Sequence, residues 1–234
     1  MDLLFTILDN VEMGRISDNI IEIKQHIPQG VKLVAVSKTK PISDIEEVYN
    51  VGQRVFGENK VQEMEDKYRA LPKDIEWHLI GHLQSNKVKY IAPFVAMIHA
   101  VDSEQLLKVI DKEGAKNNRV IDCLIQIHIA QEDTKFGFSE KEAEDFFQSN
   151  NWMQYNHVRI CGLMGMATFT DDNQQIRLEF KSLKRLFDSI KTTSMSEEES
   201  FNQLSMGMSG DFQIGIEEGS TLVRVGSAIF GDRH

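Results

Sequence analysis

The chain has 234 residues, 41% hydrophobic and 26% charged, which is the composition of an ordinary globular protein. Its formal net charge of -10 opposes binding to polyanions, so we expect no nucleic acid partner. No run reaches the roughly 20 apolar residues that a membrane span needs, and the start of the chain carries acidic residues where a signal peptide needs basic ones.

An N-terminal helical stretch extends through about Gln25, and eight short apolar runs follow it. A longer polar or amphipathic segment with helical features follows each run, and serine caps at Ser43 and Ser103 mark two of the helix starts. Eight strand and helix repeats predict an α/β fold, a closed (β/α)8 TIM barrel that forms a single domain over residues 1–234. The expected strands are residues 31–37, 54–58, 76–81, 97–102, 122–130, 159–167, 202–208 and 221–229.

Two cysteines and two histidines are candidates for a cross-link or a metal site. Cys123 and Cys161 lie in apolar strand-like runs, so we interpret them as reduced core thiols, which fits a cytoplasmic protein. His78 and His82 are four residues apart, a spacing that suits a metal pair on a helix. Because the segment around them is expected to be a strand end, no metal site is predicted.

Lys38 ends the first apolar run, at the point where a strand is expected to lead into a helix. Ligands of α/β barrels bind at the carboxyl ends of the strands, so this is a position for chemistry. Burial favours the neutral form of a lysine, and a neutral amine can attack an aldehyde to form a Schiff base. The alternative is a solvated lysine that has no chemical role.

Small-residue turns follow the last two expected strands. In barrels, the loops after strands seven and eight often bind phosphate through backbone N–H groups. Gly226 and Ser227 are the candidates after the eighth strand, and Ser209 is the candidate after the seventh. Such turns also serve simply to end strands, so the prediction depends on finding two of them at the two expected loops.

Arg224 lies inside the eighth expected strand, between Val223 and Val225. A central strand should not hold an unpaired arginine, so Arg224 needs a partner. One candidate is an internal salt bridge with Glu58. The other is a ring nitrogen of a heteroaromatic ligand, which a guanidinium would leave unprotonated because it does not give up its own proton readily.

Seven ordered motifs lie at residues 35–41, 56–59, 77–81, 83–87, 162–164, 204–209 and 219–226. They resemble those of the pyridoxal phosphate homeostasis proteins, whose fold is similar to the barrel domain of alanine racemase, the fold type III arrangement. The resemblance runs from about Val31 to Gly231. Lys60 departs from the aromatic residue expected after the Gly-Glu-Asn motif, which bears on the edge of the pocket.

The resemblance implies that Lys38 holds pyridoxal 5'-phosphate (PLP) as a lysine aldimine, and that Lys40 does not. It also implies that Arg224 faces the pyridine nitrogen. The resemblance places Ser209, Gly226 and Ser227 at the phosphate, and Asn59, His78 and Asn86 near the mouth of the barrel. Each of these last three also has a local role open to it, as a helix cap, a packed strand-end residue or a loop hydrogen-bonding residue.

The residues and the resemblance leave three functions open. The favoured one is intracellular PLP homeostasis and delivery to apo-enzymes by a monomeric, cytoplasmic protein without catalytic turnover. The second is a PLP-dependent amino-acid racemase or decarboxylase. Racemisation needs an acid or base on each face of the substrate. The chain ends three residues beyond the expected barrel and offers no evident second base. The third, a sugar-phosphate barrel enzyme, leaves Lys38 and Arg224 without a joint role.

Overall fold

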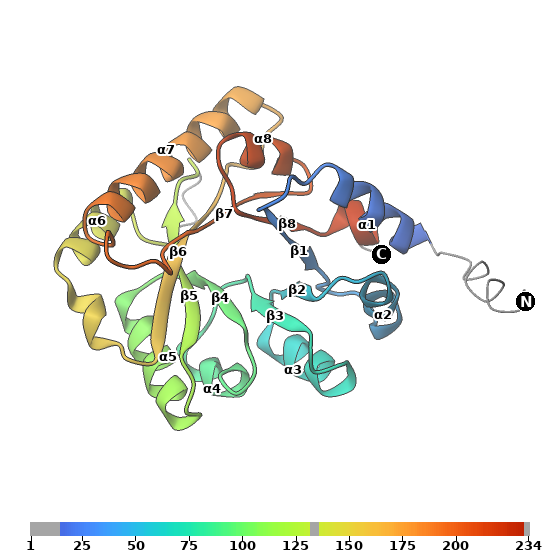
Figure 1. Ribbon diagram of the computed structural model, residues 1–234, viewed down its shortest axis with the longest axis horizontal. Helices are drawn as coiled ribbons and strands as arrows, with labels where there is room; N and C mark the ends of the chain where they lie inside the picture. The colour runs from blue at the N-terminus through green and yellow to red at the C-terminus, as the bar shows by residue number, and fades with distance from the viewer. Residues whose placement is uncertain (1–14, 132–135, 232–234) are drawn as a thin grey trace, which may run out of the picture.

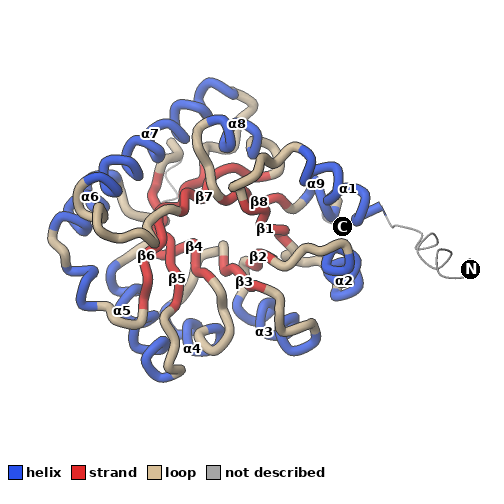
Figure 2. The backbone as a smooth tube through the Cα atoms, viewed as in Figure 1, coloured by secondary structure: helices blue, strands red, loops and turns tan. Residues whose placement is uncertain are grey.

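The structure is a computed structural model that describes residues 15–131 and 136–231. Eight parallel strands pair in sequence order, and β1 (Lys32–Val36) closes the sheet by pairing with β8 (Leu222–Val225). Figures 1 and 2 show the strands as an inner ring and the helices as an outer layer around it. The predicted TIM barrel is confirmed.

The element bounds agree closely with the apolar runs of the sequence. The other strands are β2 (Val55–Glu58), β3 (Glu76–Leu79), β4 (Met97–Val101), β5 (Ile121–His128), β6 (Val158–Met166) and β7 (Gln203–Met208). The helices are α1 (Arg15–Gln25), α2 (Ile42–Asn50), α3 (Val61–Ala70), α4 (Val88–Ile91), α5 (Glu104–Lys116), α6 (Glu140–Gln148), α7 (Asn173–Thr192), α8 (Phe212–Glu217) and α9 (Ser227–Phe230), with the short 3-10 helices η1 (Ser85–Lys87) and η2 (Asn151–Gln154).

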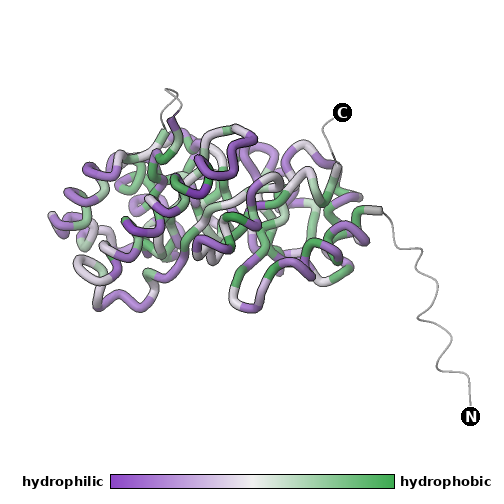
Figure 3. The backbone as a smooth tube through the Cα atoms, turned by 90° about the horizontal axis from the view of Figure 1, so that it is seen from above, coloured by the Kyte–Doolittle hydropathy of each residue, from purple (hydrophilic) through white to green (hydrophobic). Residues whose placement is uncertain are grey.

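Side chains alternate along each strand, and this alternation divides the core into two parts. In β1, Leu33 and Ala35 belong to the large cluster between the strands and the helices, whereas Val34 belongs to a smaller cluster. The smaller cluster contains Met97, Leu124, Met164 and Leu222 as well, and it fills the inside of the barrel. Figure 3 shows hydrophilic residues along the outer helices.

Two boundaries differ from the prediction. The eighth strand ends at Val225, because Gly226 leaves the extended conformation and Ser227 begins the short helix α9. Ser43 is not the cap of α2: the helix begins at Ile42, and its N-cap is Pro41, which makes no side-chain cap bond. By contrast, Ser103 accepts a hydrogen bond from the Leu106 N–H and caps α5, as predicted.

The first and last described helices meet at the seam of the barrel. Helix α1 packs against α9, and the Asn19 side chain donates to the Ile229 carbonyl oxygen at 2.9 Å. In Figure 1 the blue helix α1 lies beside the red C-terminal segment. Among the residues described, there is no helix with the length and apolarity that crossing a bilayer requires.

Candidate functional site

A cavity of about 720 Å³ opens at the carboxyl ends of the strands. Its volume lies within the range of small-molecule and cofactor sites. Six of the eight predicted site residues line it: Lys38, Asn59, Ser209, Arg224, Gly226 and Ser227. Its wall also contains Val36, Lys40, Ile80, Gly81, His82, Gln126, Phe136, Met166, Phe169, Met208, Gly210 and Gly231.

Lys38 is half-buried at the cavity, two residues beyond the end of β1. Thr39, the next residue, has a φ of 65°, a left-handed conformation that a β-branched residue rarely adopts. The Nζ of Lys40, two residues further along the chain, donates to the carbonyl oxygens of Phe230 and Gly231, both at 3.0 Å. Both lysines line the cavity, and Lys40 also fastens the loop after β1 to the end of α9.

Arg224 is buried in β8, and its guanidinium is held by the neighbouring strands. Nη1 donates to the carbonyl oxygen of Ser205 at 2.9 Å and to the Ser205 hydroxyl, and Nη2 donates to the Gly165 carbonyl oxygen at 3.0 Å. Burial lowers the pKa of Arg224 to about 10, while the charge of Asp211 acts in the opposite direction. Arg224 is therefore a fixed cation at neutral pH.

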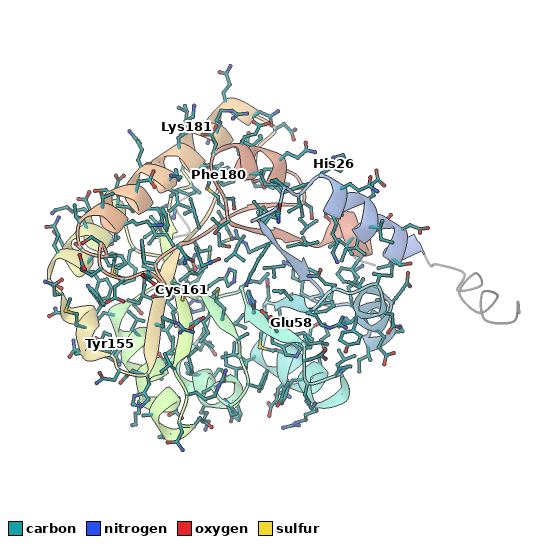
Figure 4. The ribbon with its side chains drawn as sticks, in the orientation of Figure 1. His26, Glu58, Tyr155, Cys161, Phe180 and Lys181 are labelled. Atoms are coloured by element: carbon teal, nitrogen blue, oxygen red, sulfur yellow. The ribbon has the colours of Figure 1, made fainter. Side chains whose placement is uncertain are left out.

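The alternative of a salt bridge between Arg224 and Glu58 is wrong. Glu58 is fully buried, and its carboxylate pairs with Lys67 of α3, with 2.8 Å between Oε1 and Nζ. Figure 4 labels Glu58 between the barrel axis and α3.

The loops after β7 and β8 are joined by one hydrogen bond. The Gly226 N–H donates to Ser209 Oγ at 3.0 Å, which leaves the hydroxyl proton of Ser209 available to a ligand. Ser227 begins α9, where the first N–H groups have no partner within the helix. A Cβ at Gly226 would lie 3.1 Å from both Cβ and O of Val36, so a larger residue there would have to displace part of β1.

The structure places the last two predicted site residues away from the cavity wall. His78 is buried inside the barrel, because alternation along β3 turns Trp77 outward and His78 inward. Asn86 is exposed on η1. That His78 and Asn86 act near the mouth of the barrel stays a prediction, and so does the role of Asn59.

A chain of hydrogen bonds links His78 to Arg224 across the barrel. His78 Nδ1 lies 2.9 Å from His99 Nε2, and His99 Nδ1 lies 3.1 Å from the Ser205 hydroxyl that accepts from Arg224. Burial lowers the pKa of His78 to about 3, with a smaller contribution from the charge of Lys32. The pKa of His99 is also lowered, chiefly by burial. Both imidazoles are therefore neutral at pH 7.

Two further polar groups at the cavity were missed from the sequence. His82 pairs with Asp102, with 2.9 Å between Nδ1 and Oδ2, and its ring packs against Phe136. Gln126 is a buried amide in β5 that donates to the Phe136 carbonyl oxygen at 3.1 Å. A polar residue between Ile125 and Ile127 was a usable sequence signal for Gln126.

No group of three or more metal-ligating side chains occurs among residues 15–131 and 136–231. Cys123 and Cys161 are buried free thiols, and burial raises the pKa of both, that of Cys161 to about 12. These thiols are therefore neutral core groups.

The cavity combines an amine, a buried cation and small-residue loops with N–H and O–H donors. A phosphorylated aromatic aldehyde would match these groups one by one: Lys38 for the aldehyde, Arg224 for a ring acceptor, and the loops after β7 and β8 for the phosphate. Gly210 adds space, because nothing lies within 4 Å of a Cβ built there.

Comparison with known proteins identifies a matching family and relatives of similar sequence. The sequence model for the alanine racemase N-terminal domain matches residues 11–234. The pyridoxal phosphate homeostasis protein of Aquifex aeolicus is 40% identical over 203 residues, which are 86% of this chain and 87% of the relative. The chain belongs to the pyridoxal phosphate homeostasis protein family.

Other members and solved structures agree with this assignment. The family member of Pasteurella multocida is 35% identical and covers 93% of this chain and 97% of its own length. PipY of Synechococcus elongatus is 31% identical, and its structure without PLP matches with a TM-score of 0.86 over 92% of this chain and 100% of PipY. The structure of PipY with PLP bound matches with a TM-score of 0.83.

Alanine racemase has the same barrel within a longer chain. The Bartonella henselae enzyme matches with a TM-score of 0.71 at 17% identity, over 93% of this chain and 61% of the enzyme. At that identity the likeness concerns the fold.

Proposed function

We propose that this protein binds PLP in the cavity, holds it as a Schiff base on Lys38, and acts in intracellular PLP homeostasis and delivery in the cytoplasm. The observation that carries the proposal is the convergence of Lys38, Arg224 and Ser209 on one cavity from the ends of β1, β8 and β7. The solved PLP complex of PipY supports it, because that relative shares the fold over 92% of this chain.

In the proposed bond-forming step, the neutral ε-amine of Lys38 adds to the aldehyde carbon. The C=O bond is replaced by a C=N bond, and the aldehyde oxygen leaves as water with the two amine protons. Arg224 remains protonated throughout, because even its lowered pKa of about 10 lies well above neutral pH. A ring nitrogen facing Arg224 would therefore accept a hydrogen bond and stay unprotonated, which makes the ring a poor electron sink.

The test of the covalent bond is borohydride reduction of protein supplied with PLP, followed by peptide mass spectrometry. We expect the pyridoxyl mass on Lys38, and Lys38→Ala should lose the absorption band near the visible edge while its far-UV circular dichroism is unchanged. Lys89→Ala is the matched control, because Lys89 is an exposed lysine of α4 that does not line the cavity. Modification mainly at Lys40 or Lys87 would refute the assignment.

Delivery requires a separate experiment. Protein loaded with PLP is mixed with an apo-aminotransferase, and the recovery of transaminase activity is compared with the rate at which an excess of a soluble aldehyde scavenger removes PLP. Activation faster than release to the scavenger would support direct transfer to the acceptor. Equal rates would reduce the role to storage followed by free diffusion. Size-exclusion chromatography with light scattering checks the expected monomer.

A specific observation favours a second candidate, an amino-acid racemase or decarboxylase. His82 and Asp102 form an imidazole and carboxylate pair at the cavity, an arrangement that can accept a proton. The deciding assay incubates loaded protein with single enantiomers of alanine and follows chirality and α-deuterium exchange in heavy water. We expect negligible turnover. Rates of roughly 1 per second or more, lost in His82→Gln, would replace delivery with racemisation.

A further inference from the structure

Lys67 of α3 carries a buried ammonium group whose three donors are all engaged. The residue is 5% exposed. Nζ donates to Glu58 Oε1 at 2.8 Å, to Glu63 Oε1 at 2.7 Å and to the Ser37 carbonyl oxygen at 2.8 Å. An ammonium has three N–H bonds, so this geometry uses each of them once. The group is fixed in position by two carboxylates and one main-chain carbonyl.

The same cluster holds the chain on both sides of Lys38. On one side, the Ser37 carbonyl accepts from Lys67, and the Ser37 hydroxyl donates to Glu58 Oε1 at 2.6 Å. On the other side, the Thr39 N–H donates to Glu63 Oε1 at 2.5 Å. Lys38 is thus the one residue between two main-chain anchor points, and both points are linked to Lys67 directly or through Glu63.

Stability gives a poor account of this cluster. A buried ion pair loses its hydration, and replacing such a pair with apolar residues is often neutral or stabilising. Here the cost of burial is visible: Glu58 Oε2 is buried without a hydrogen-bond partner among the described residues, and desolvation raises the pKa of Glu58. The left-handed conformation of Thr39 is also unfavourable, and such strain persists where surrounding contacts hold it.

We propose that Lys67 is a positioning residue for Lys38: through Glu58, Glu63 and the Ser37 carbonyl it fixes the loop after β1 so that the Lys38 amine stays at the cavity wall. The inference rests on the proposed Schiff base at Lys38. It predicts that the cluster controls how fast the lysine reacts, and that it has little effect on how tightly the cavity holds a ligand without an aldehyde.

The experiment measures two quantities for each variant by stopped-flow absorbance and fluorescence titration. The first is the second-order rate of Schiff base formation with PLP. The second is the Kd of 4'-deoxypyridoxine 5'-phosphate, which has the ring and phosphate of PLP without the aldehyde. Lys67→Met should slow Schiff base formation by about tenfold to a hundredfold, as expected for a displaced reacting group. Its Kd for the analogue should stay within about twofold.

Two further variants make the result decisive. Arg69→Met is the matched control, because Arg69 is an exposed cation on the same helix that pairs with Glu65. It should react at the parent rate. Glu63→Ala removes the acceptor of the Thr39 N–H at a side chain that is 22% exposed, so it tests the inference even where Lys67→Met does not fold.

The outcomes separate the two proposals. Slow reaction with an unchanged analogue Kd in Lys67→Met or Glu63→Ala supports the positioning role. Parent-like reaction rates in the folded variants overturn it while leaving the Schiff base intact. A parent protein that forms no Schiff base on Lys38 overturns the proposed covalent function, and the positioning role with it.

Discussion

Replacing Ser209 with alanine removes a hydroxyl that joins the loops after β7 and β8. In the structure, Ser209 Oγ accepts the Gly226 N–H at 3.0 Å, and the hydroxyl proton of Ser209 can point into the cavity. A phosphate bound between these loops would gain that proton as a donor. The substitution therefore removes one hydrogen bond from the free protein and two from the complex.

The magnitudes follow from this difference. The bond to Gly226 exists in both states, so its loss lowers the free energy of unfolding by about 1 kcal/mol, the usual worth of a neutral hydrogen bond. It cancels in binding. The bond to phosphate exists only in the complex, and a hydrogen bond to a charged group is worth about 1.5–3 kcal/mol, which corresponds to a Kd about 10- to 150-fold higher.

Titration with 4'-deoxypyridoxine 5'-phosphate measures binding without the covalent bond, and urea unfolding measures stability. Ser43→Ala is the matched control, since Ser43 is an exposed serine on α2 that does not line the cavity. It should change neither quantity appreciably. Loss of stability in Ser209→Ala with an unchanged Kd would show that Ser209 only braces the two loops, and the phosphate site would have to be sought elsewhere.

Two further predictions concern the barrel itself. The pKa values of His78 and His99 are lowered in the folded protein, so below about pH 6.5 the unfolded chain binds protons that the folded chain does not. The free energy of unfolding should therefore decrease as the pH is lowered from about 6.5 towards 3. The decrease should reach up to about 1.4 kcal/mol per pH unit for each histidine. The raised pKa of Glu58 partly offsets this loss of stability at the acidic end of the range. Urea unfolding at pH 7, 6 and 5 measures the net dependence, and a free energy of unfolding that does not change with pH would contradict the assignment of neutral imidazoles. Gly226→Ala should lower the unfolding free energy by about 1–3 kcal/mol, because its Cβ would lie 3.1 Å from Val36; thermal melting tests this, and an unchanged Tm would refute the close packing.

The barrel could be predicted because each strand is a compact apolar run between amphipathic segments. The end of β8 could not, since Ala228, Ile229 and Phe230 continue the apolar character while the main chain turns at Gly226 into α9. The apolar residues there serve a helix that packs on α1. Composition alone does not distinguish these two uses of the same residues.

Much of the cavity could be predicted because its residues follow strand ends, which converge at one face of a barrel. His78 illustrates the limit. Its motif position does not reveal a side-chain partner, and the alternation in β3 directs its side chain inside the barrel, where its Nδ1 lies 2.9 Å from His99 Nε2. The pairing of Glu58 with Lys67 could not be predicted either. In the sequence, Lys67 resembles an ordinary solvated residue of an amphipathic helix, and only the packing of α3 against β2 brings it to Glu58.

The seam between β1 and β8 joins elements that lie far apart along the chain. Its contacts are among the most distant along the chain: Asn19 bonds Ile229, and Lys40 bonds Phe230 across 190 residues. Closing a long loop costs conformational entropy before the contact is gained, so we expect these contacts to form later than local strand and helix pairs. We therefore expect the loop after β1 to reach its final position only when α9 has packed, so that ligand binding would report closure of the barrel.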